Sequence, residues 1–217
     1  MREESGVALI KNLTGKPVFQ AVDPTLLRTK DEWRMIENKV EGIYEKYILC
    51  YFLGNNRNSR EFANRLSKKT NIPIITLPYM GGIFTKIDYR FGDKQLYDIG
   101  PAEFIYLIHH AEYVCTDSYH GTIFSIIFEK EFFCFRRFYE EKTKSLNLRI
   151  DSLLKTLKID GRIIEEDFNL NFDQLIHTKI DYLTVDIHLS RKRRESNKYL
   201  SDSLSLAVNK LSEMYDS

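Results

Sequence analysis

Apolar and polar positions along the chain form two patterns, short apolar runs and longer amphipathic segments. Residues 47–53 form a near-continuous apolar run, which is typical of a strand buried on both faces of a parallel sheet. The turn Gly54-Asn55-Asn56 follows this run, and amphipathic spacing over 58–70 then predicts a helix. The same alternation of strand and helix continues to about residue 157.

The remaining elements follow from the same patterns, with Gly15 as a helix stop and Gly100-Pro101 as a helix start. The predicted strands are 17–22, 47–53, 72–77, 112–116 and 131–135. The predicted helices are 3–14, 30–40, 58–70, 101–110, 121–128, 145–157 and 190–214. A long loop is predicted over 78–98 and a polar segment over 138–147.

Alternating strands and helices predict an α/β fold, a doubly wound and mostly parallel Rossmann-like sheet with helices on both faces. We expect this domain over residues 46–189, a linking segment over 1–45 and a C-terminal helix over 190–217. Ligands of such sheets bind outside the carboxyl ends of the strands. Loops that begin at Gly54, Pro78 and Asp117 leave predicted strands at that edge.

Composition narrows the class of protein. A net charge of +1 provides no overall field that would select nucleic acid. The basic run Arg191–Arg194 is either a solvated helix face or a contact for anionic lipid or a glycan carrier. Cys50, Cys115 and Cys134 lie in apolar runs without CxxC spacing, so we expect buried free thiols. We expect a cytoplasmic protein without a signal peptide or membrane span, and contact with the inner face of the membrane stays open.

The loop that begins at Asp117 carries the strongest chemical signal. It follows a predicted buried strand and leads directly into a helix, where backbone amides and the hydroxyl of Ser118 or Thr122 favour an anion. Gly121 allows close backbone approach, and His120 is placed to act as general acid or base. In the alternative interpretation, Asp117 or Ser118 caps the helix and His120 is an ordinary loop histidine.

The other histidines do not indicate a site. His109 and His110 are expected late in a helix, where a cationic imidazole interacts favourably with the helix dipole. His177 and His188 have no metal-ligand partner at a useful spacing. We therefore expect no bound metal.

Residues 112–128 read Glu-Tyr-Val-Cys-Thr-Asp-Ser-Tyr-His-Gly-Thr-Ile-Phe-Ser-Ile-Ile-Phe. This stretch resembles the signature of the polysaccharide pyruvyl transferase family, Thr-Asp-Ser-(Phe/Tyr)-His-Gly followed by an apolar helix. The resemblance implies the C-terminal domain of a two-Rossmann-domain, GT-B-type architecture with the active site between the domains. It also implies that the N-terminal domain is missing from this chain and is supplied in cis or in trans. Weaker similarity to the family is carried by residues 2–6, 23–27, 47–54, 99–104 and 146–149.

The resemblance implies transfer of pyruvate from phosphoenolpyruvate to two hydroxyls of a sugar in a surface or exopolysaccharide, as a ketal. It implies no cofactor beyond this donor, and a glycan or lipid-linked sugar as the acceptor. Protonation of the donor methylene carbon requires an acid, and His120 is our candidate. Two other classes stay open, a nucleotide-sugar glycosyltransferase domain and a non-catalytic domain that binds a glycan or a partner.

Phosphoenolpyruvate carries a carboxylate and a phosphate, so cations must hold it. The resemblance places Arg2 at the substrate, and an arginine without a substrate role is the alternative. It also implies a basic residue downstream of the histidine, for which the candidates are Arg136, Arg137 and Lys142. We prefer Arg136 and Arg137 because they follow a predicted strand on the ligand side of the sheet.

Three further residues are candidates for supporting roles. Asn147 and Arg149 match an Asn-x-Arg pattern of the family, and they either support the site or cap and decorate a helix. Asp117 either orients His120 or caps the following helix.

Overall fold

The protein is described by a computed structural model that covers residues 1–217 except 80–86, 138–146, 166–167, 169–170 and 216–217, with the backbone alone for Ser5 and 209–215. Its described residues contain one six-stranded sheet in which every pair of neighbouring strands is parallel. The strands are β1 (Ile48–Tyr51), β2 (Ile74–Thr76), β3 (Lys94–Gln95), β4 (Tyr113–Thr116), β5 (Glu131–Phe135) and β6 (Ile163–Ile164). The helices are α1 (Glu4–Thr14), the 3-10 helix η1 (Pro24–Leu27), α2 (Lys30–Arg34), α3 (Arg57–Thr70), α4 (Pro101–His110), α5 (Tyr119–Ile127), α6 (Leu148–Leu157), α7 (Phe172–His177) and α8 (Tyr182–Tyr215).

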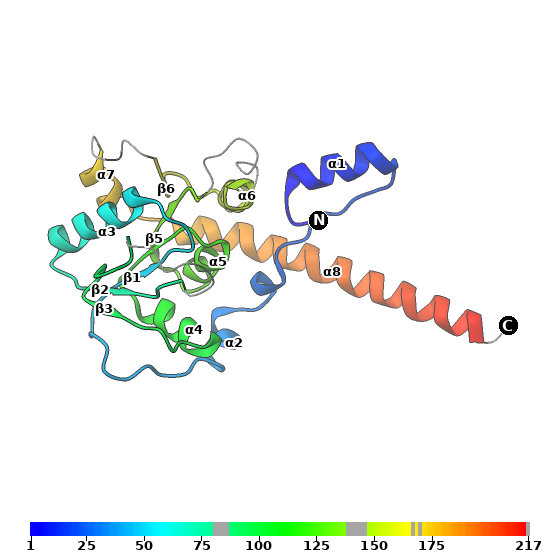
Figure 1. Ribbon diagram of the computed structural model, residues 1–217. Helices are drawn as coiled ribbons and strands as arrows, with labels where there is room; N and C mark the ends of the chain where they lie inside the picture. The colour runs from blue at the N-terminus through cyan, green and yellow to red at the C-terminus, as the bar shows by residue number, and fades with distance from the viewer. Residues whose placement is uncertain (80–86, 138–146, 166–167, 169–170, 216–217) are drawn as a thin grey trace.

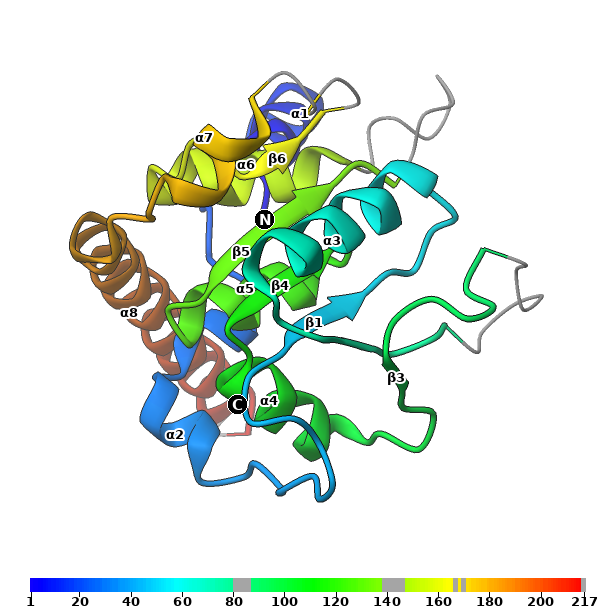
Figure 2. The same ribbon diagram turned by 90° about the vertical axis from the view of Figure 1, so that its left-hand side faces the viewer.

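The strand order β3-β2-β1-β4-β5-β6 confirms the predicted doubly wound α/β fold. The chain builds outward from β1 to β3, and then returns to the other side of β1 and builds outward from β4 to β6 (Figures 1 and 2). Ile48 of β1 therefore lies opposite both Ile74 of β2 and Tyr113 of β4. In such a sheet the strand order reverses between β1 and β4, and ligands bind at the carboxyl ends of the strands at this switch point.

Both faces of the sheet are buried, as the apolar runs predict. Leu49 faces the core that α4, α5, α6 and α8 cover, whereas Cys50 faces the core beneath α3 and α7. Figure 2 shows α3 crossing in front of the sheet. The ring of Phe62 on α3 is fully buried and packs against Phe133 with ring centroids 4.8 Å apart. The three cysteines are free and buried, as predicted.

Residues 17–22 are not a strand, contrary to the prediction. Their backbone groups bond outside the sheet, because the Met1 ammonium donates to the Phe19 carbonyl and the Ala21 amide donates to the Met1 carbonyl. The Val22 amide donates to the Ser196 hydroxyl on α8. These hydrogen bonds to Met1 and Ser196 therefore take the place of a strand neighbour for three backbone groups of the apolar run.

The predicted helix 30–40 is also shorter in the structure. It ends at Arg34 as α2, which begins with a capping box between Thr29 and Glu32. Beyond it, the Asn38 amide donates to the Ala102 carbonyl of α4. This tertiary hydrogen bond replaces a helical one and holds the segment against α4.

Other boundaries differ because short elements carry too little periodicity for a prediction. The helix predicted at 121–128 begins two residues earlier, at Tyr119, and β3 lies inside the predicted loop 78–98. The elements β6 and α7 were not predicted. The segment 138–147 and the start of the helix predicted at 145–157 fall largely on residues outside the described ones, and α6 begins at Leu148.

The C-terminal helix begins at Tyr182, eight residues before the predicted start, so the expected boundary at residue 190 lies within α8. Its first turn is capped by Asp181, whose carboxylate accepts from the Thr184 amide at 3.2 Å. Farther along, Arg193 donates to the carbonyl oxygens of Leu26 and Arg28 and therefore holds the η1 segment rather than facing solvent.

Figure 1 shows α1 and the distal part of α8 projecting beyond the layers of the sheet. Among the described residues, no helix combines the length and apolar character needed to cross a membrane.

Candidate active site

The candidate site lies at the carboxyl ends of β1 and β4, at the switch point of the sheet. Tyr51 and Thr116 end these strands opposite one another. The Thr116 hydroxyl donates to the Tyr51 carbonyl at 2.7 Å and accepts from the Ser118 amide at 3.0 Å. One buried hydroxyl thus joins the two strand ends and sets the direction of the loop that follows β4.

Asp117 ties the β4 loop to the β1 loop. Its two carboxylate oxygens accept from the Leu53 amide at 2.7 Å and from the Gly54 amide at 2.8 Å. Burial raises the pKa of Asp117, and the two amide hydrogen bonds oppose this rise. The structure therefore corrects both predicted roles, because the carboxylate neither orients His120 nor caps α5.

Arg137 and Arg60 both contact Gly54, where the β1 loop meets the β4 loop. A Cβ atom on Gly54 would lie 2.7 Å from Cγ of Arg137, so only glycine fits between the two loops. Arg60 of α3 is 5% exposed and donates to the carbonyl oxygens of Gly54 at 2.7 Å and Asn56 at 3.2 Å. Its guanidinium also pairs with Asp88 at 2.7 Å. No sequence motif indicated Arg60, whose partners lie on separate loops.

The predicted anion-binding residues at the start of α5 are used inside the protein. The Ser118 hydroxyl caps the helix by accepting from the Gly121 amide at 3.3 Å. The fully buried Thr122 hydroxyl donates to the Ser118 carbonyl and lies 3.2 Å from Sγ of Cys134. A Cβ atom on Gly121 would lie 2.6 Å from Oγ1 of Thr116, so this glycine is needed for contact between helix and strand. The structure corrects the expectation that these hydroxyls face a ligand, since both are buried and internally bonded.

His120 differs from these neighbours because it faces outward from the first turn of α5. Its side chain is 55% exposed and lines a hollow of about 510 Å³. Among the described residues that line the hollow, it is the only one with a nitrogen in its side chain. The remaining wall is apolar or aromatic and consists of Tyr51, Leu77, Pro78, Tyr79, Leu96, Tyr97, Ile99, Gly100, Pro101, Phe104 and Phe124.

Asp23 is a site residue that the sequence did not indicate. It is 4% exposed, and its Oδ2 lies 2.7 Å from Nη1 of Arg2 while its Oδ1 lies 3.9 Å from Nε2 of His120. Burial raises the pKa of Asp23, but hydrogen bonds from Arg2 and Thr25 outweigh burial and lower that pKa below its ordinary value. An ionised carboxylate thus lies between Arg2 and His120. The Asp-Pro pair at 23–24 indicated a turn, and only the fold brings it beside α5.

We predict that Asp23→Asn lowers the melting temperature at pH 7 and that the loss diminishes as the pH falls. A carboxyl whose pKa is lowered by folding stabilises the protein above its unfolded pKa, near 3.8, and this contribution is lost as the pH falls through the folded value. Melting curves of wild type and variant between pH 7 and pH 3 measure the difference. A difference that stays constant over this range contradicts the assignment. Asp160→Asn, at an exposed position, is the control.

The candidate basic residues after β5 point in different directions. Arg136 and Arg137 follow β5 at the carboxyl edge of the sheet, as predicted. Nη1 of Arg136 lies 2.8 and 2.9 Å from the two carboxylate oxygens of Asp151 on α6, and its Nη2 is 3.7 Å from Glu165. Arg136 is therefore committed to a structural ion pair, whereas Arg137 lies against the β1 loop. Lys142 lies outside the described residues.

Asn147 and Arg149 lie at the start of α6. Asn147 is 9% exposed and occupies the N-cap position, but its side chain makes no capping hydrogen bond. Nε of Arg149 lies 3.5 Å from a Glu3 carboxylate oxygen. Arg149 also lines a small cavity of about 30 Å³ together with Arg2 and Asp23, which is room for about one water molecule. The structure therefore brings two candidate binding residues, Arg2 and Arg149, to the same small cavity.

These features define a Rossmann-like α/β domain with a side-chain cluster at its switch point. A solved structure with a similar fold is the UDP-GlcNAc 2-epimerase of Methanocaldococcus jannaschii, in complex with UDP-GlcNAc and UDP. The TM-score is 0.54 at 16% sequence identity, and the match covers 94% of this chain and 60% of that chain. This similarity supports the predicted GT-B-type fold. Our chain spans about three-fifths of the length of the epimerase chain.

The family of the chain follows from its sequence. The family model for polysaccharide pyruvyl transferase matches residues 1–137, which include Arg2, Asp23, His120 and Arg137. The chain therefore belongs to the polysaccharide pyruvyl transferase family, as predicted. A search of curated proteins finds no match.

Proposed function

We propose that the chain is the C-terminal domain of a polysaccharide pyruvyl transferase that acts in the cytoplasm. It would transfer pyruvate from phosphoenolpyruvate to a sugar of a surface or exopolysaccharide as a ketal, without a further cofactor. The observation that carries this proposal is the position of His120, within the family match, as the only nitrogen-bearing side chain on the described wall of the hollow at the switch point.

The proposed chemistry needs a proton donor and a proton acceptor. Protonation of the donor methylene carbon gives a methyl group and an oxocarbenium-like centre, which one sugar hydroxyl attacks. The second hydroxyl then displaces phosphate and completes the ketal. Of the two hydroxyl protons, one replaces the proton given to the methylene carbon and the other leaves with phosphate. A histidine suits both tasks near neutral pH, and His120 is exposed to the hollow where the substrates would bind.

Arg2 and Arg137 are the proposed contacts for the carboxylate and phosphate of the donor. A guanidinium has five N–H donors, and Asp23 accepts from Nη1 of Arg2, so further donors of this group remain for a ligand. Arg137 lies beside the β1 loop at the switch point. Two carboxylates, those of Asp151 and Glu165, already flank the Arg136 guanidinium and would repel an anionic donor, so we do not place Arg136 at the substrate.

The aromatic wall of the hollow suits a sugar acceptor. Tyr79 and Tyr97 are 47% and 51% exposed, and both line the hollow with His120. Ring faces with polar edges provide apolar contact and hydrogen bonds together, which is typical of small-molecule sites. We propose that the acceptor sugar packs on these rings.

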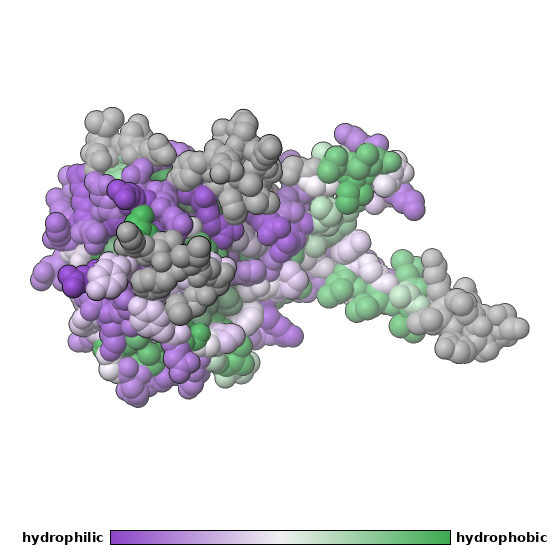
Figure 3. Space-filling view, in the orientation of Figure 1, coloured by the Kyte–Doolittle hydropathy of each residue, from purple (hydrophilic) through white to green (hydrophobic). Residues whose placement is uncertain are grey.

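A second Rossmann-like domain is the proposed partner, in cis or in trans. Exposed apolar side chains gather on α1 and on the distal part of α8 (Figure 3). Leu9 and Leu13 on α1 are 59% and 75% exposed, and Leu200 and Leu204 on α8 are 48% and 58% exposed. Exposed apolar patches often mark contact surfaces, and the match leaves two-fifths of the similar epimerase chain uncovered. We propose that this surface contacts the second domain.

The proposal is tested by thermal-shift titration of the chain with phosphoenolpyruvate, a UDP-sugar and inorganic phosphate. We predict saturable stabilisation by phosphoenolpyruvate, of about 2.7 kcal/mol at a hundred times its Kd. Arg137→Ala should weaken this binding at least tenfold, and the exposed Arg28→Ala should not. Stabilisation by the UDP-sugar alone would favour a glycosyltransferase domain. If no ligand stabilises the chain with or without a co-expressed second domain, a non-catalytic binding domain is favoured.

A further inference from the structure

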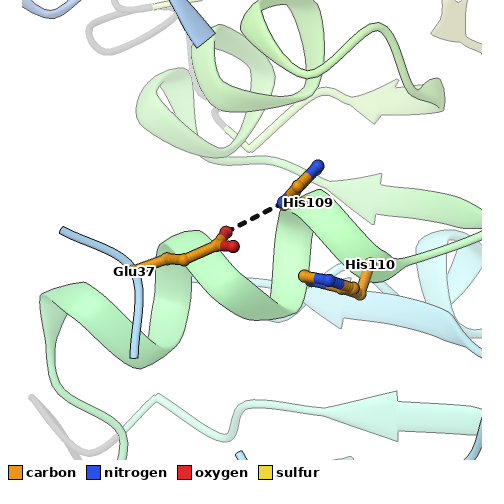
Figure 4. Close-up of side chains that lie close together, drawn as sticks. All are labelled: Glu37, His109 and His110. Carbon is orange, nitrogen blue, oxygen red and sulfur yellow. Dashed lines mark hydrogen bonds and ion pairs between the residues drawn. The ribbon is translucent and has the colours of Figure 1, made fainter. Parts of the chain in front are cut away.

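A second polar cluster lies away from the proposed active site, at the end of α4. It consists of Glu37, from the segment after α2, and the consecutive residues His109 and His110 (Figure 4). One ligand atom from each residue lies within 4.8 Å of those of the other two. Because α4 leads into the start of β4, the cluster lies at the edge of the sheet opposite to His120. Local sequence patterns do not indicate this cluster, since 72 positions separate Glu37 from His109.

Hydrogen bonds orient both imidazole rings. Nδ1 of His109 lies 2.8 Å from a Glu37 carboxylate oxygen, and Nδ1 of His110 lies 2.9 Å from the Tyr106 carbonyl oxygen. Both partners only accept hydrogen bonds, so each Nδ1 donates, and the neutral His110 ring then carries its lone pair on Nε2. A carbonyl partner of this kind is typical of a metal-binding histidine, whose orientation it holds. At His109, an ion beside Glu37 would take the place of the proton between Nδ1 and the carboxylate, so that both atoms bind it.

Packing and charge also favour a cation here. The His109 ring stacks on Phe128 with centroids 4.7 Å apart, which limits its movement. The carbonyl groups at the end of α4 supply partial negative charge. The charge of Lys130 also acts on the His109 ring and opposes a cation, whereas the Glu37 carboxylate attracts one.

The spacing requires only a small rearrangement. Two ligand atoms at about 2.0–2.1 Å from one tetrahedral ion lie roughly 3.4 Å apart. The Glu37–His109 pair is already at 2.8 Å, with side chains 18% and 23% exposed. His110 is exposed, so its ring can turn to bring the third ligand closer without disturbing the core.

We propose that Glu37, His109 and His110 form a binding site for a divalent transition-metal ion of the Zn²⁺ class, with water completing the coordination. Two imidazoles and a carboxylate are the donor set that such ions prefer over Mg²⁺ or Ca²⁺. The ion would join the segment between α2 and β1 to α4. Its role is structural, because the cluster lies at the edge of the sheet opposite to the proposed active site.

The test is calorimetric titration of the metal-free chain, purified without a polyhistidine tag, with Zn²⁺ alone. We expect one ion per chain, a higher melting temperature with Zn²⁺, and ligand-field absorption when Co²⁺ replaces Zn²⁺. His110→Ala and Glu37→Gln should each weaken Zn²⁺ binding at least tenfold. His177→Ala, at an exposed histidine on α7, is the matched control and should bind as wild type does.

His110→Ala is the decisive variant, since an exposed side chain is removed and circular dichroism can verify the fold. Absence of saturable Zn²⁺ binding to the wild-type chain would overturn the proposal. Equal affinity in wild type and His110→Ala would overturn it as well, because the ion would then bind elsewhere. None of these measurements depends on transferase activity, so the outcome is separate from the proposed function.

Discussion

His120→Gln is expected to lower the rate of pyruvyl transfer by about 10²–10⁴-fold, the usual contribution of a general acid or base. Glutamine keeps a polar side chain of similar reach but has no group that exchanges a proton near neutral pH. The measurement is phosphate release from phosphoenolpyruvate in the presence of sugar acceptors, with the second domain supplied. Since His120 lines the hollow and 55% of its side chain is exposed, the replacement should leave the melting temperature nearly unchanged.

The control for this prediction is His177→Gln, which removes an exposed imidazole from α7 and should retain the full rate. Binding of phosphoenolpyruvate separates chemistry from affinity, because a proton-transfer role predicts a loss in kcat and little change in Kd. A variant that retains most of the rate would exclude His120 as the acid or base. Loss of binding without loss of kcat would assign it to substrate contact instead.

Arg60→Ala is expected to lower the free energy of unfolding by about 3–5 kcal/mol, since removal of one partner leaves a buried charge uncompensated. Arg60 is 5% exposed, pairs with Asp88 at 2.7 Å, and donates to the carbonyl oxygens of Gly54 and Asn56. Its guanidinium also lies over the Phe52 ring at 4.6 Å. Urea denaturation of wild type and variant measures the difference.

The matched control is Arg28→Ala, which removes an exposed arginine that pairs with Glu32 at the same 2.7 Å. Exposed ion pairs contribute about 0–1 kcal/mol, so this variant should unfold close to wild type. Similar losses in the two variants would contradict the role that we give to burial. If Arg60→Ala keeps its stability, the β1 loop must be held by other contacts, such as those of Asp117.

Sequence patterns identify some residues of the site and miss others. The loop after β4 was predicted from its place between a buried strand and a helix, and His120 was singled out there. Its neighbours were harder to assign, because Asp117, Ser118 and Thr122 have polar side chains that suit a ligand as well as an internal bond. Burial decided between these roles, and burial depends on what the rest of the chain places against them.

Asp23 and Arg60 show what local patterns cannot reveal. Asp23 precedes η1, 97 positions before His120, and it approaches His120 only because η1 packs against α5 and α8. Arg60 lies on a helix whose periodicity predicts a polar face, yet the β1 loop covers its side chain. Interpretation of a single segment gives no information about the second segment that covers it.

The sequence by itself determined the α/β fold, the central strands, the buried cysteines and the family. Each of these depends on apolar runs or a contiguous motif, in which neighbouring positions carry the information. Only the tertiary structure decided that residues 17–22 form no strand, that α8 begins at Tyr182, and that Glu37 meets His109. The physical reason is that hydrogen-bond partners and burial come from segments far apart in the chain, and folding alone brings those segments together.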